Sequence, residues 1–285
     1  MNLAYIVSAY KLPDQLVRLV LKLNSETSHF FIHVDRKTDD ATWRRISTAL
    51  SRFSNVHFLP RHRCYYGGFG HVRATIKAIS EIIRRRLPFD YTILLTGQDY
   101  PIKSNQQIDT FFNRHEGQSF MEYFPLPHAE WDYGGIDRIT YWHLRFGRNY
   151  FRIPGRSVAS FRRRFPSLQL FGGSAYWCLS RESTEHVHRF LQEQRAYTRF
   201  FEYVNVPEEI FFHTILLNSP LGQRVVNDDL RFLEWRNPAV AGGPAILRKE
   251  DLGKIMNSSK LFARKFDSTQ DAEILDMIDA QTRDG

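Results

Sequence analysis

Two adjacent carboxylates, Glu208 and Glu209, stand immediately before a strongly apolar stretch of the chain. The apolar residues of positions 210–217 recur at helical spacing, and Pro207 suits a first helical turn because its missing N–H would have no partner there. The spacing predicts one helix that begins at Pro207. Both carboxylates then complement the positive end of the helix dipole. Alternatively, one of them faces a cleft as a general base, with its pKa raised by an apolar wall.

Further acidic residues follow predicted strands. Asp35 is interpreted either as a turn residue or as an acid that grips a ribose or uracil, since ligands of open parallel sheets bind beyond the carboxyl ends of the strands. Asp99 has Gln98 and Tyr100 as neighbours, so no two-carboxylate metal site is visible there. The pair Asp228–Asp229 favours a turn over a metal site.

The elements that must position these residues alternate between strands and helices. Apolar runs and helical spacing predict strands at residues 3–9, 29–34, 56–59, 91–96, 120–124 and 172–179, and helices at 12–23, 72–86, 107–113 and 182–194. This alternation indicates an open, mostly parallel sheet. The glycines of residues 67–70 match neither a dinucleotide fingerprint nor a P-loop, which argues against a nicotinamide oxidoreductase.

Residues 125–171 differ in composition from the rest of the chain, because tryptophan, tyrosine and arginine are frequent there. No regular structure is predicted for them. They are interpreted either as an irregular basic surface insertion or as a flexible flap over a substrate.

Composition limits the partners and the compartment. The formal net charge of +8 favours an acidic partner: a nucleic acid, an anionic membrane surface or a phosphate-bearing small molecule. Cys64 and Cys178 lack metal spacing, so we expect reduced thiols without a disulfide or a zinc site. No run spans a membrane and no leader opens the chain, which predicts a cytoplasmic protein, with peripheral membrane contact left open.

Five stretches in register carry a family resemblance. They are residues 33–37, 95–105, 173–177, 207–209 and 261–267. Their order and spacing resemble the core-2/I-branching β-1,6-N-acetylglucosaminyltransferases and the related peptide O-xylosyltransferases, glycosyltransferase family 14. The resemblance implies a GT-A type fold and an inverting transfer from a UDP-sugar without the usual metal-binding Asp-x-Asp motif.

The resemblance also implies roles for individual residues. These are the catalytic base Glu209; donor-binding Val7, Asp35, Tyr66, Arg264 and Lys265; and acceptor-binding Glu122 and Trp235. One departure from the family concerns an additional arginine that branching enzymes carry upstream of the lysine. The corresponding place here is near Gly242–Gly243, so either Arg248 or Arg264 supplies the second cation.

We therefore expect an α/β, GT-A type fold with a mostly parallel central sheet flanked by helices. Residues 1–285 would form one catalytic domain, with a nucleotide-binding half at 1–124, the insertion at 125–171, and an acceptor-binding and catalytic half at 172–285. The expected activity moves N-acetylglucosamine or xylose from a UDP-sugar to a glycan, glycolipid or peptide acceptor, with no cofactor or metal. The alternative is a non-catalytic module for polyanions or nucleic acid, but no nucleic-acid-binding motif supports it.

Overall fold

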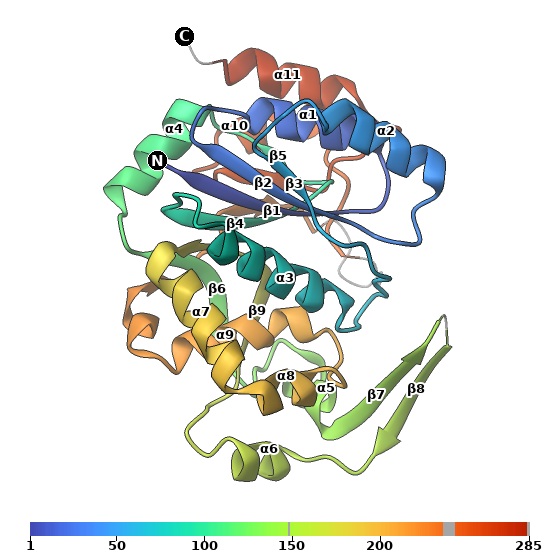
Figure 1. Cartoon of the computed structure of the whole chain (residues 1–285), viewed down its shortest axis with the longest axis vertical. Helices are drawn as coiled ribbons and strands as arrows, with labels where there is room; N and C mark the ends of the chain where they lie inside the picture. Colours follow the sequence, from blue (N-terminus) through green and yellow to red (C-terminus); the bar gives the residue numbers. More distant parts are fainter. Residues whose placement is uncertain (148, 236–242, 284–285) are drawn as a thin grey trace. The chain divides into compact units, whose positions relative to one another are not determined.

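A computed structural model describes residues 1–147, 149–235 and 243–283. The chain forms two compact units, each assembled from segments that are distant in sequence. Unit 1 comprises Met1–Arg61, Pro88–Glu116 and Leu230–Gly285, and unit 2 comprises His62–Leu87 and Gly117–Asp229. The predicted halves at 1–124 and 172–285 do not coincide with these units, and their functional division stays a prediction. The elements of both units are labelled in Figure 1.

Unit 1 contains a parallel sheet of four strands in the order β4–β1–β2–β3. These strands are β1 (Leu3–Ala9), β2 (Ser28–Val34), β3 (Val56–Phe58) and β4 (Tyr91–Thr96). The strands form because they are continuous apolar runs, and nearly every residue of β1 and β2 is buried. The four sequence predictions for these strands are confirmed within one residue.

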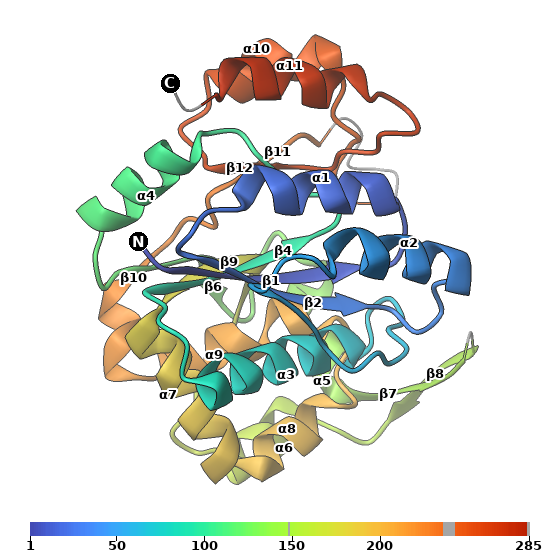
Figure 2. The same ribbon diagram turned by 45° about the horizontal axis from the view of Figure 1, so that its top comes forward.

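A second, three-stranded sheet in unit 1 has the order β11–β12–β5. The remaining elements of unit 1 are β5 (Tyr100–Pro101), β11 (Arg231–Leu233), β12 (Phe262–Arg264), α1 (Pro13–Leu23), α2 (Asp40–Leu50), α4 (Asn105–Arg114), α10 (Leu252–Met256), α11 (Glu273–Gln281) and the 3₁₀ turn η4 (Lys249–Asp251). Figure 2 shows α10 and α11 side by side. The parallel sheet with flanking helices is the α/β arrangement that the sequence predicted.

Unit 2 is built on a three-stranded sheet in the order β10–β6–β9. The strands of unit 2 are β6 (Ser119–Pro125), β7 (Tyr141–Phe146), β8 (Asn149–Pro154), β9 (Phe171–Ser180) and β10 (Val225–Val226), of which β7 and β8 form a separate pair. Its helices are α3 (Gly70–Arg85), α5 (Asp137–Thr140), α6 (Val158–Arg164), α7 (Arg181–Glu193), α8 (Arg195–Phe201) and α9 (Phe211–Leu217), with 3₁₀ turns η1 (Asp132–Gly135), η2 (Pro207–Glu209) and η3 (Pro220–Arg224).

Aromatic side chains form much of the core of unit 2. The ring of Tyr197 lies 4.6 Å from that of Phe201 and 5.0 Å from that of Phe211, and the ring of Phe161 lies 5.3 Å from that of Phe200. Because aromatic pairs bury large apolar areas, these contacts attach α6, α8 and α9 to one another. Much of the high aromatic content is therefore explained by packing.

The prediction of irregular structure for residues 125–171 is wrong. These residues contain η1, α5, α6 and the antiparallel hairpin β7–β8, which pairs from Tyr141↔Pro154 to Phe146↔Asn149. The hairpin alternates apolar residues with arginine and histidine, which is a strand pattern that the sequence analysis missed. None of the described helices is both long enough and apolar enough to cross a membrane.

Candidate functional site

The carboxyl ends of three parallel strands lie together at one edge of unit 1. The backbone N–H of Asp35, just past β2, donates to the carbonyl of Ala9 at 2.9 Å, and the N–H of Gly97, just past β4, donates to that of Ser8 at 2.9 Å. Val7 lies within β1, paired with Ile32 and Leu95, and is buried. Open parallel sheets bind ligands at such an edge.

Asp35 is buried and forms a turn at this edge. Its Oδ1 accepts a hydrogen bond from the backbone N–H of Lys37 at 2.8 Å, and the Nζ of Lys37 lies 3.4 Å from Oδ2. Arg61 donates to the carbonyl oxygens of Val34, Asp35 and Thr38, which holds the turn in place. The turn interpretation is therefore confirmed, and the nucleotide-binding role of Asp35 stays a prediction.

Asp99 and Arg264 provide opposite charges in the interior of unit 1. The Oδ2 of fully buried Asp99 accepts hydrogen bonds from the backbone N–H of Thr96 at 2.6 Å and from its hydroxyl at 2.5 Å. Arg264 ends β12 and is 8% exposed. Burial lowers the pKa of Arg264, whereas the nearby Asp99 and Tyr10 raise it. The negative charge of Asp99 thus compensates the positive charge of the buried Arg264, which gives the single acid after β4 a structural role.

Lys265 extends this charge toward solvent. The peptide bond that joins it to Arg264 is cis. Partial burial lowers the pKa of Lys265, and the positive charges of Arg264 and Lys11 lower it further. Lys11 follows β1, and its Nζ donates to Oδ2 of Asp267 at 2.8 Å. Arg264, Lys265 and Lys11, hereafter the cation cluster, thus come from β12 and from the carboxyl end of β1.

Gly243 marks the place of the additional arginine of branching enzymes. A Cβ added to Gly243 would lie 3.5 Å from Nζ of Lys265, so the backbone passes close to that ammonium group. Its φ of 82° is in the left-handed region, which favours glycine. Gly242 lies outside the described residues. Gly243 places the backbone beside Lys265 but has no side chain to contribute a charge.

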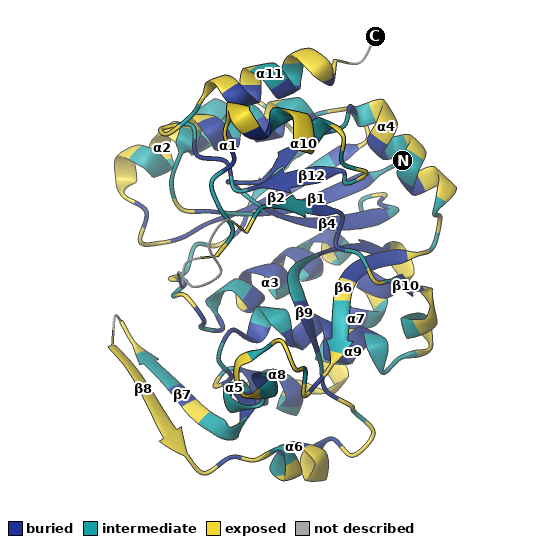
Figure 3. Ribbon diagram, turned by 180° about the vertical axis from the view of Figure 1, so that it is seen from behind, coloured by how far each residue is buried: buried dark blue, intermediate teal, exposed yellow. Residues whose placement is uncertain are grey.

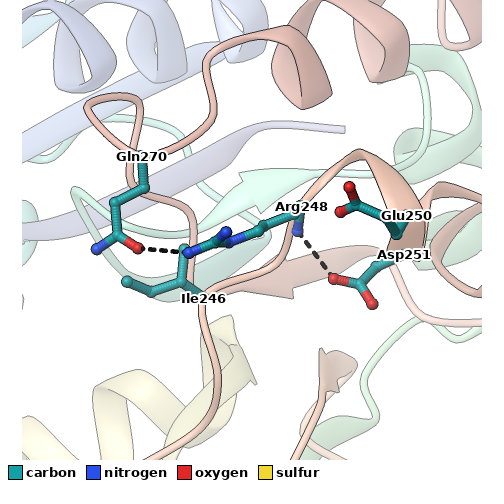
Figure 4. Close-up of a pocket in the computed structure, with 5 residues that line it drawn as sticks. All are labelled: Ile246, Arg248, Glu250, Asp251 and Gln270. Carbon is teal, nitrogen blue, oxygen red and sulfur yellow. Dashed lines mark hydrogen bonds between the residues drawn. The ribbon is translucent and has the colours of Figure 1, made fainter.

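Arg248 lies in a depression of about 600 Å³ in unit 1, lined also by Ile246, Glu250, Asp251 and Gln270 (Figure 4). Its guanidinium donates to Oε1 of Gln270 at 3.2 Å, and its backbone N–H donates to Oδ2 of Asp251 at 2.8 Å. Arg248 is exposed, whereas Arg264 is buried beside Lys265. The geometry therefore favours Arg264 as the second cation.

Glu209 is held by an arginine of unit 2. The guanidinium of Arg138 donates to its Oε2 at 2.5 Å, and the side chain of Glu209 keeps 30% of its area exposed. Arg138 itself stacks on Trp131, with its guanidinium carbon 3.7 Å from the ring centroid. The carboxylate is therefore both oriented and accessible, as a general base requires. Sequence reasoning missed Arg138, because nothing in the sequence pairs it with a residue 71 positions away.

The carboxyl group of Glu208 is partly buried, and its pKa is raised. Although part of the residue is exposed, its Oε2 is buried and has no hydrogen-bond partner within the described parts of the chain. Burial and, to a smaller extent, the negative charge of Glu209 raise the pKa of Glu208 from 4.5 to about 7, although Arg138 and Arg145 oppose the shift. A general base with a raised pKa was one of the two alternatives in the sequence analysis; the raised pKa belongs to Glu208, whereas the family resemblance assigns the base to Glu209.

The helix predicted over residues 207–217 is divided into two parts. Pro207–Glu209 forms a 3₁₀ turn, Ile210 has φ −134°, and α9 begins only at Phe211. The side chain of Ile210, at the break between the turn and the helix, is fully buried. The carboxylates consequently precede α9 instead of forming its first turn, and Glu209 pairs with a guanidinium.

A glycine turn connects Tyr66 to these acids through Arg145. The N–H of Val206 donates to the carbonyl of Gly67 at 2.9 Å. A Cβ at Gly67 would lie 2.6 Å from Nη2 of Arg145, so only glycine fits there. Burial lowers the pKa of Arg145, while Tyr150, Glu208 and Tyr66 raise it. Tyr66 itself is 87% exposed.

The predicted acceptor residues lie in different units. Glu122 is exposed on β6, where the pairing with β9 shifts register between Met121 and Tyr123. Trp235 follows β11 in unit 1 and is 59% exposed. Unit 1 thus contains Val7, Asp35, Trp235, Arg264 and Lys265, and unit 2 contains Tyr66, Glu122 and Glu209.

Comparison with known proteins identifies the family. The family model described as "Branch: Core-2/I-Branching enzyme" matches residues 3–256. The chain belongs to this family. Its parallel sheet with flanking helices and its family membership together confirm the predicted GT-A type α/β fold class.

Curated relatives of this core-2/I-branching enzyme chain are larger proteins. Xylosyltransferase 2 of Rattus norvegicus is 25% identical over 283 residues, which cover 93% of this chain and 32% of the relative. Xylosyltransferase 1 of Homo sapiens is 24% identical over 283 residues, which cover 93% of this chain and 28% of the relative. The chain spans about a third of the length of the curated relatives it matches.

The similarity to solved structures is slight. A 4-diphosphocytidyl-2C-methyl-D-erythritol synthase from Anaerococcus prevotii gives a TM-score of 0.34 at 8% identity, covering 68% of this chain and 75% of that chain. These values are too low to relate the two folds.

The acids that the sequence offered for a metal have other partners in this family member. Asp99 is bonded to Thr96 and lies near Arg264, and Oδ2 of Asp229 accepts a hydrogen bond from the hydroxyl of Ser174 at 2.6 Å. Within the described residues, neither Asp99 nor the pair Asp228–Asp229 belongs to a cluster of three or more metal-ligating side chains.

Proposed function

We propose that this chain is a glycosyltransferase that moves N-acetylglucosamine or xylose from a UDP-sugar to a hydroxyl group of a glycan, glycolipid or peptide. The transfer would invert the anomeric configuration and proceed without a metal. The observation that carries the proposal is the cation cluster of unit 1, which adjoins the carboxyl end of its parallel sheet.

The cation cluster matches the charge that a leaving nucleotide acquires. When the bond between the anomeric carbon and UDP breaks, the electron pair stays on the diphosphate, which many transferases stabilise with a divalent ion. Arg264 offers a planar fork of donors and Lys265 a point charge. Fixed charges of this kind contribute roughly 10²–10³ in rate for each donor. We assign binding of the donor to these cations together with Val7, Asp35 and Tyr66.

A single base is enough for an inverting displacement. The acceptor oxygen forms a bond to the anomeric carbon while the bond to UDP breaks, and the hydroxyl proton passes to a carboxylate. We assign this proton to Glu209, whose carboxylate is accessible and oriented by Arg138. Its neighbour Glu208 is partly protonated near neutral pH, since its pKa is about 7.

The names of the relatives indicate which sugar donors to test first, and two exposed side chains indicate where an acceptor would bind. Because the curated relatives carry the name xylosyltransferase, UDP-xylose is the first donor to test, followed by UDP-N-acetylglucosamine. Exposed Trp235 offers an apolar ring for a sugar face, and exposed Glu122 offers an acceptor for sugar hydroxyls. We assign both to acceptor binding.

The decisive experiment measures binding and hydrolysis of a panel of UDP-sugars by the whole chain, first in EDTA and then with manganese. The wild type is compared with Glu209→Gln and, as a matched control, with Glu193→Gln, an exposed carboxamide exchange at the end of α7. We expect one UDP-sugar to bind in EDTA, with binding kept and turnover lost in Glu209→Gln only.

Two results would overturn this proposal. If binding appears only with manganese, Asp99 or the pair Asp228–Asp229 acts as a metal ligand and the cation cluster does not replace the metal. If no UDP-sugar binds under either condition, the chain has kept the family fold without the donor chemistry.

A further inference from the structure

One face of the hairpin β7–β8 is apolar except for Asn149, which pairs with Phe146. Side chains alternate between the two faces of a strand, and the register pairs Trp142 with Ile153 and Leu144 with Phe151. Phe146 completes this face, and its ring centroid lies 6.4 Å from that of Phe151. We call these five side chains, Trp142, Leu144, Phe146, Phe151 and Ile153, the apolar hairpin face.

The opposite face of the hairpin attaches it to unit 2. His143 is 4% exposed, its Nδ1 lies 2.6 Å from the hydroxyl of Tyr150, and its Nε2 lies 3.1 Å from the carbonyl of Asp137. Arg145 donates to Oδ1 of Asn205 at 2.5 Å. His143 and Arg145 thus attach β7 to unit 2, whereas all of β8 is exposed. On the apolar side Trp142 also contacts unit 2, with its ring 5.2 Å from that of Tyr203 and 4.7 Å from the guanidinium carbon of Arg156.

The apolar hairpin face is exposed to solvent. Phe146 is 65% exposed, Phe151 52%, Ile153 47% and Trp142 39%. Figure 3 shows β8 exposed along its length, whereas β9 of the same unit has no exposed residue. A contiguous group of exposed large apolar side chains on a soluble unit marks an interaction surface.

The stretch of chain that contains the hairpin and α6 carries charge of one sign. Residues 141–165 contain seven arginines and no aspartate or glutamate. Arg162, Arg163 and Arg164 at the end of α6 are exposed. A partner of this region must therefore be acidic.

The exposed apolar face and the positive charge together distinguish between possible partners. A second copy of the chain would place one arginine-rich hairpin against another, so that like charges repel. The arginines could bind the acidic groups of a glycan. However, four of the five side chains of the apolar hairpin face have no hydrogen-bond donor for its hydroxyl groups. An anionic lipid surface satisfies both properties, since apolar side chains enter the acyl boundary while arginines bind the headgroups.

We propose that the apolar hairpin face docks on an anionic membrane surface, with Phe146, Phe151 and Ile153 entering the lipid and the arginines of α6 at the headgroups. The docking would hold the chain at a membrane, where lipid-linked acceptors reside. The inference does not depend on the sugar donor, because the hairpin is judged by lipid binding and not by turnover.

The experiment is co-sedimentation of the full chain with vesicles of phosphatidylcholine alone and of equal parts phosphatidylcholine and phosphatidylglycerol. We expect binding to the anionic vesicles only, weakened by salt. The double variant Phe146→Ser and Phe151→Ser should bind at least about tenfold more weakly, since it removes most of the apolar area that enters the lipid. Its control is Leu21→Ser, which changes an exposed apolar residue of α1.

Charge is tested separately. The double variant Arg162→Glu and Arg163→Glu should also lose at least about tenfold in affinity, because each basic residue near an anionic surface contributes about fivefold. Arg44→Glu, at an exposed position of α2, is the matched control. Phe151→Trp provides a readout independent of affinity, since its added fluorescence should be quenched by brominated lipids.

Three results would overturn the proposal. One is equal binding of the wild type and both double variants to anionic vesicles. Another is the absence of vesicle binding together with tight, hairpin-dependent binding of heparin, which would make the partner an acidic polysaccharide. The third is a dimer in sedimentation velocity that the two serine exchanges dissociate, without any binding to vesicles.

Discussion

The candidate site residues and their neighbours include one pair of adjacent like charges in each unit, and the two pairs have similar surroundings. In unit 1 the pair is Arg264–Lys265, and in unit 2 it is Glu208–Glu209. One member of each pair faces an opposite charge: burial lowers the pKa of Arg264 but Asp99 opposes that shift, and Arg138 bonds to Glu209. The other member is pushed toward its neutral form. Burial and a neighbouring like charge lower the pKa of Lys265 and raise that of Glu208 to about 7.

The two pairs differ in what a substrate would bring to them. A diphosphate carries the charge that the cation cluster attracts, so binding favours the protonated form of Lys265. An acceptor hydroxyl brings a proton to the acid pair instead. The proposed function therefore assigns the binding of charge to Lys265 and the movement of a proton to Glu209. The following changes test this comparison.

Removal of the base should have the largest effect. Glu209→Gln keeps the shape of the side chain but cannot accept a proton, so kcat should fall by about 10²–10⁴ with UDP-sugar affinity nearly unchanged. Steady-state kinetics and calorimetry measure the two quantities. Glu193→Gln should behave as the wild type. If Glu208→Gln loses turnover while Glu209→Gln keeps it, the roles of the two acids are reversed.

Removal of a cation should come next. Lys265→Ala should lower turnover by about 10²–10³, and it should weaken UDP binding as well, because the charge contacts the diphosphate both before and after transfer. The pairing of effects on affinity and rate distinguishes this variant from Glu209→Gln. Lys77→Ala, an exposed exchange on α3, controls for net charge. Unchanged UDP affinity in Lys265→Ala would contradict the assignment.

Glu208→Gln should change stability in a pH-dependent way. The unfolded chain releases this proton near pH 4.5, whereas the folded chain keeps it to about pH 7. The free energy of unfolding of the wild type therefore falls as pH rises through this range. Glu208→Gln should remove that fall and be more stable above about pH 7 by up to about 3 kcal/mol, since one pKa unit corresponds to about 1.36 kcal/mol.

Urea unfolding between about pH 5 and about pH 8 measures this difference. The comparison with wild type at each pH cancels the titration of all other groups. Parallel pH profiles for the two proteins would show that Glu208 ionises in the fold as it does in the unfolded chain.

Arg248→Ala should have the smallest effect. Its guanidinium is exposed and bonded to Gln270, so turnover and UDP affinity should change by less than about threefold, as for an ordinary surface position. A loss as large as that of Lys265→Ala would make Arg248 the second cation in place of Arg264.

The sequence by itself determined the parallel strands of unit 1, because continuous apolar runs can only be buried. It also determined the identity of the adjacent charged pairs and, through five stretches in register, the family. The α/β fold class and family membership could be predicted for this reason. The role of each site residue remains a prediction that the experiments above test.

Only the tertiary structure decided how the charges are distributed. The partners Arg138 and Glu209 are 71 positions apart, and nothing in their local sequence connects them. The break at Ile210 interrupts a helical apolar pattern that continues on both sides of it, and the apolar hairpin face depends on how β7 and β8 pair. Burial and charge proximity are properties of the folded chain, so the acid whose pKa is raised could not be chosen from two adjacent glutamates in the sequence.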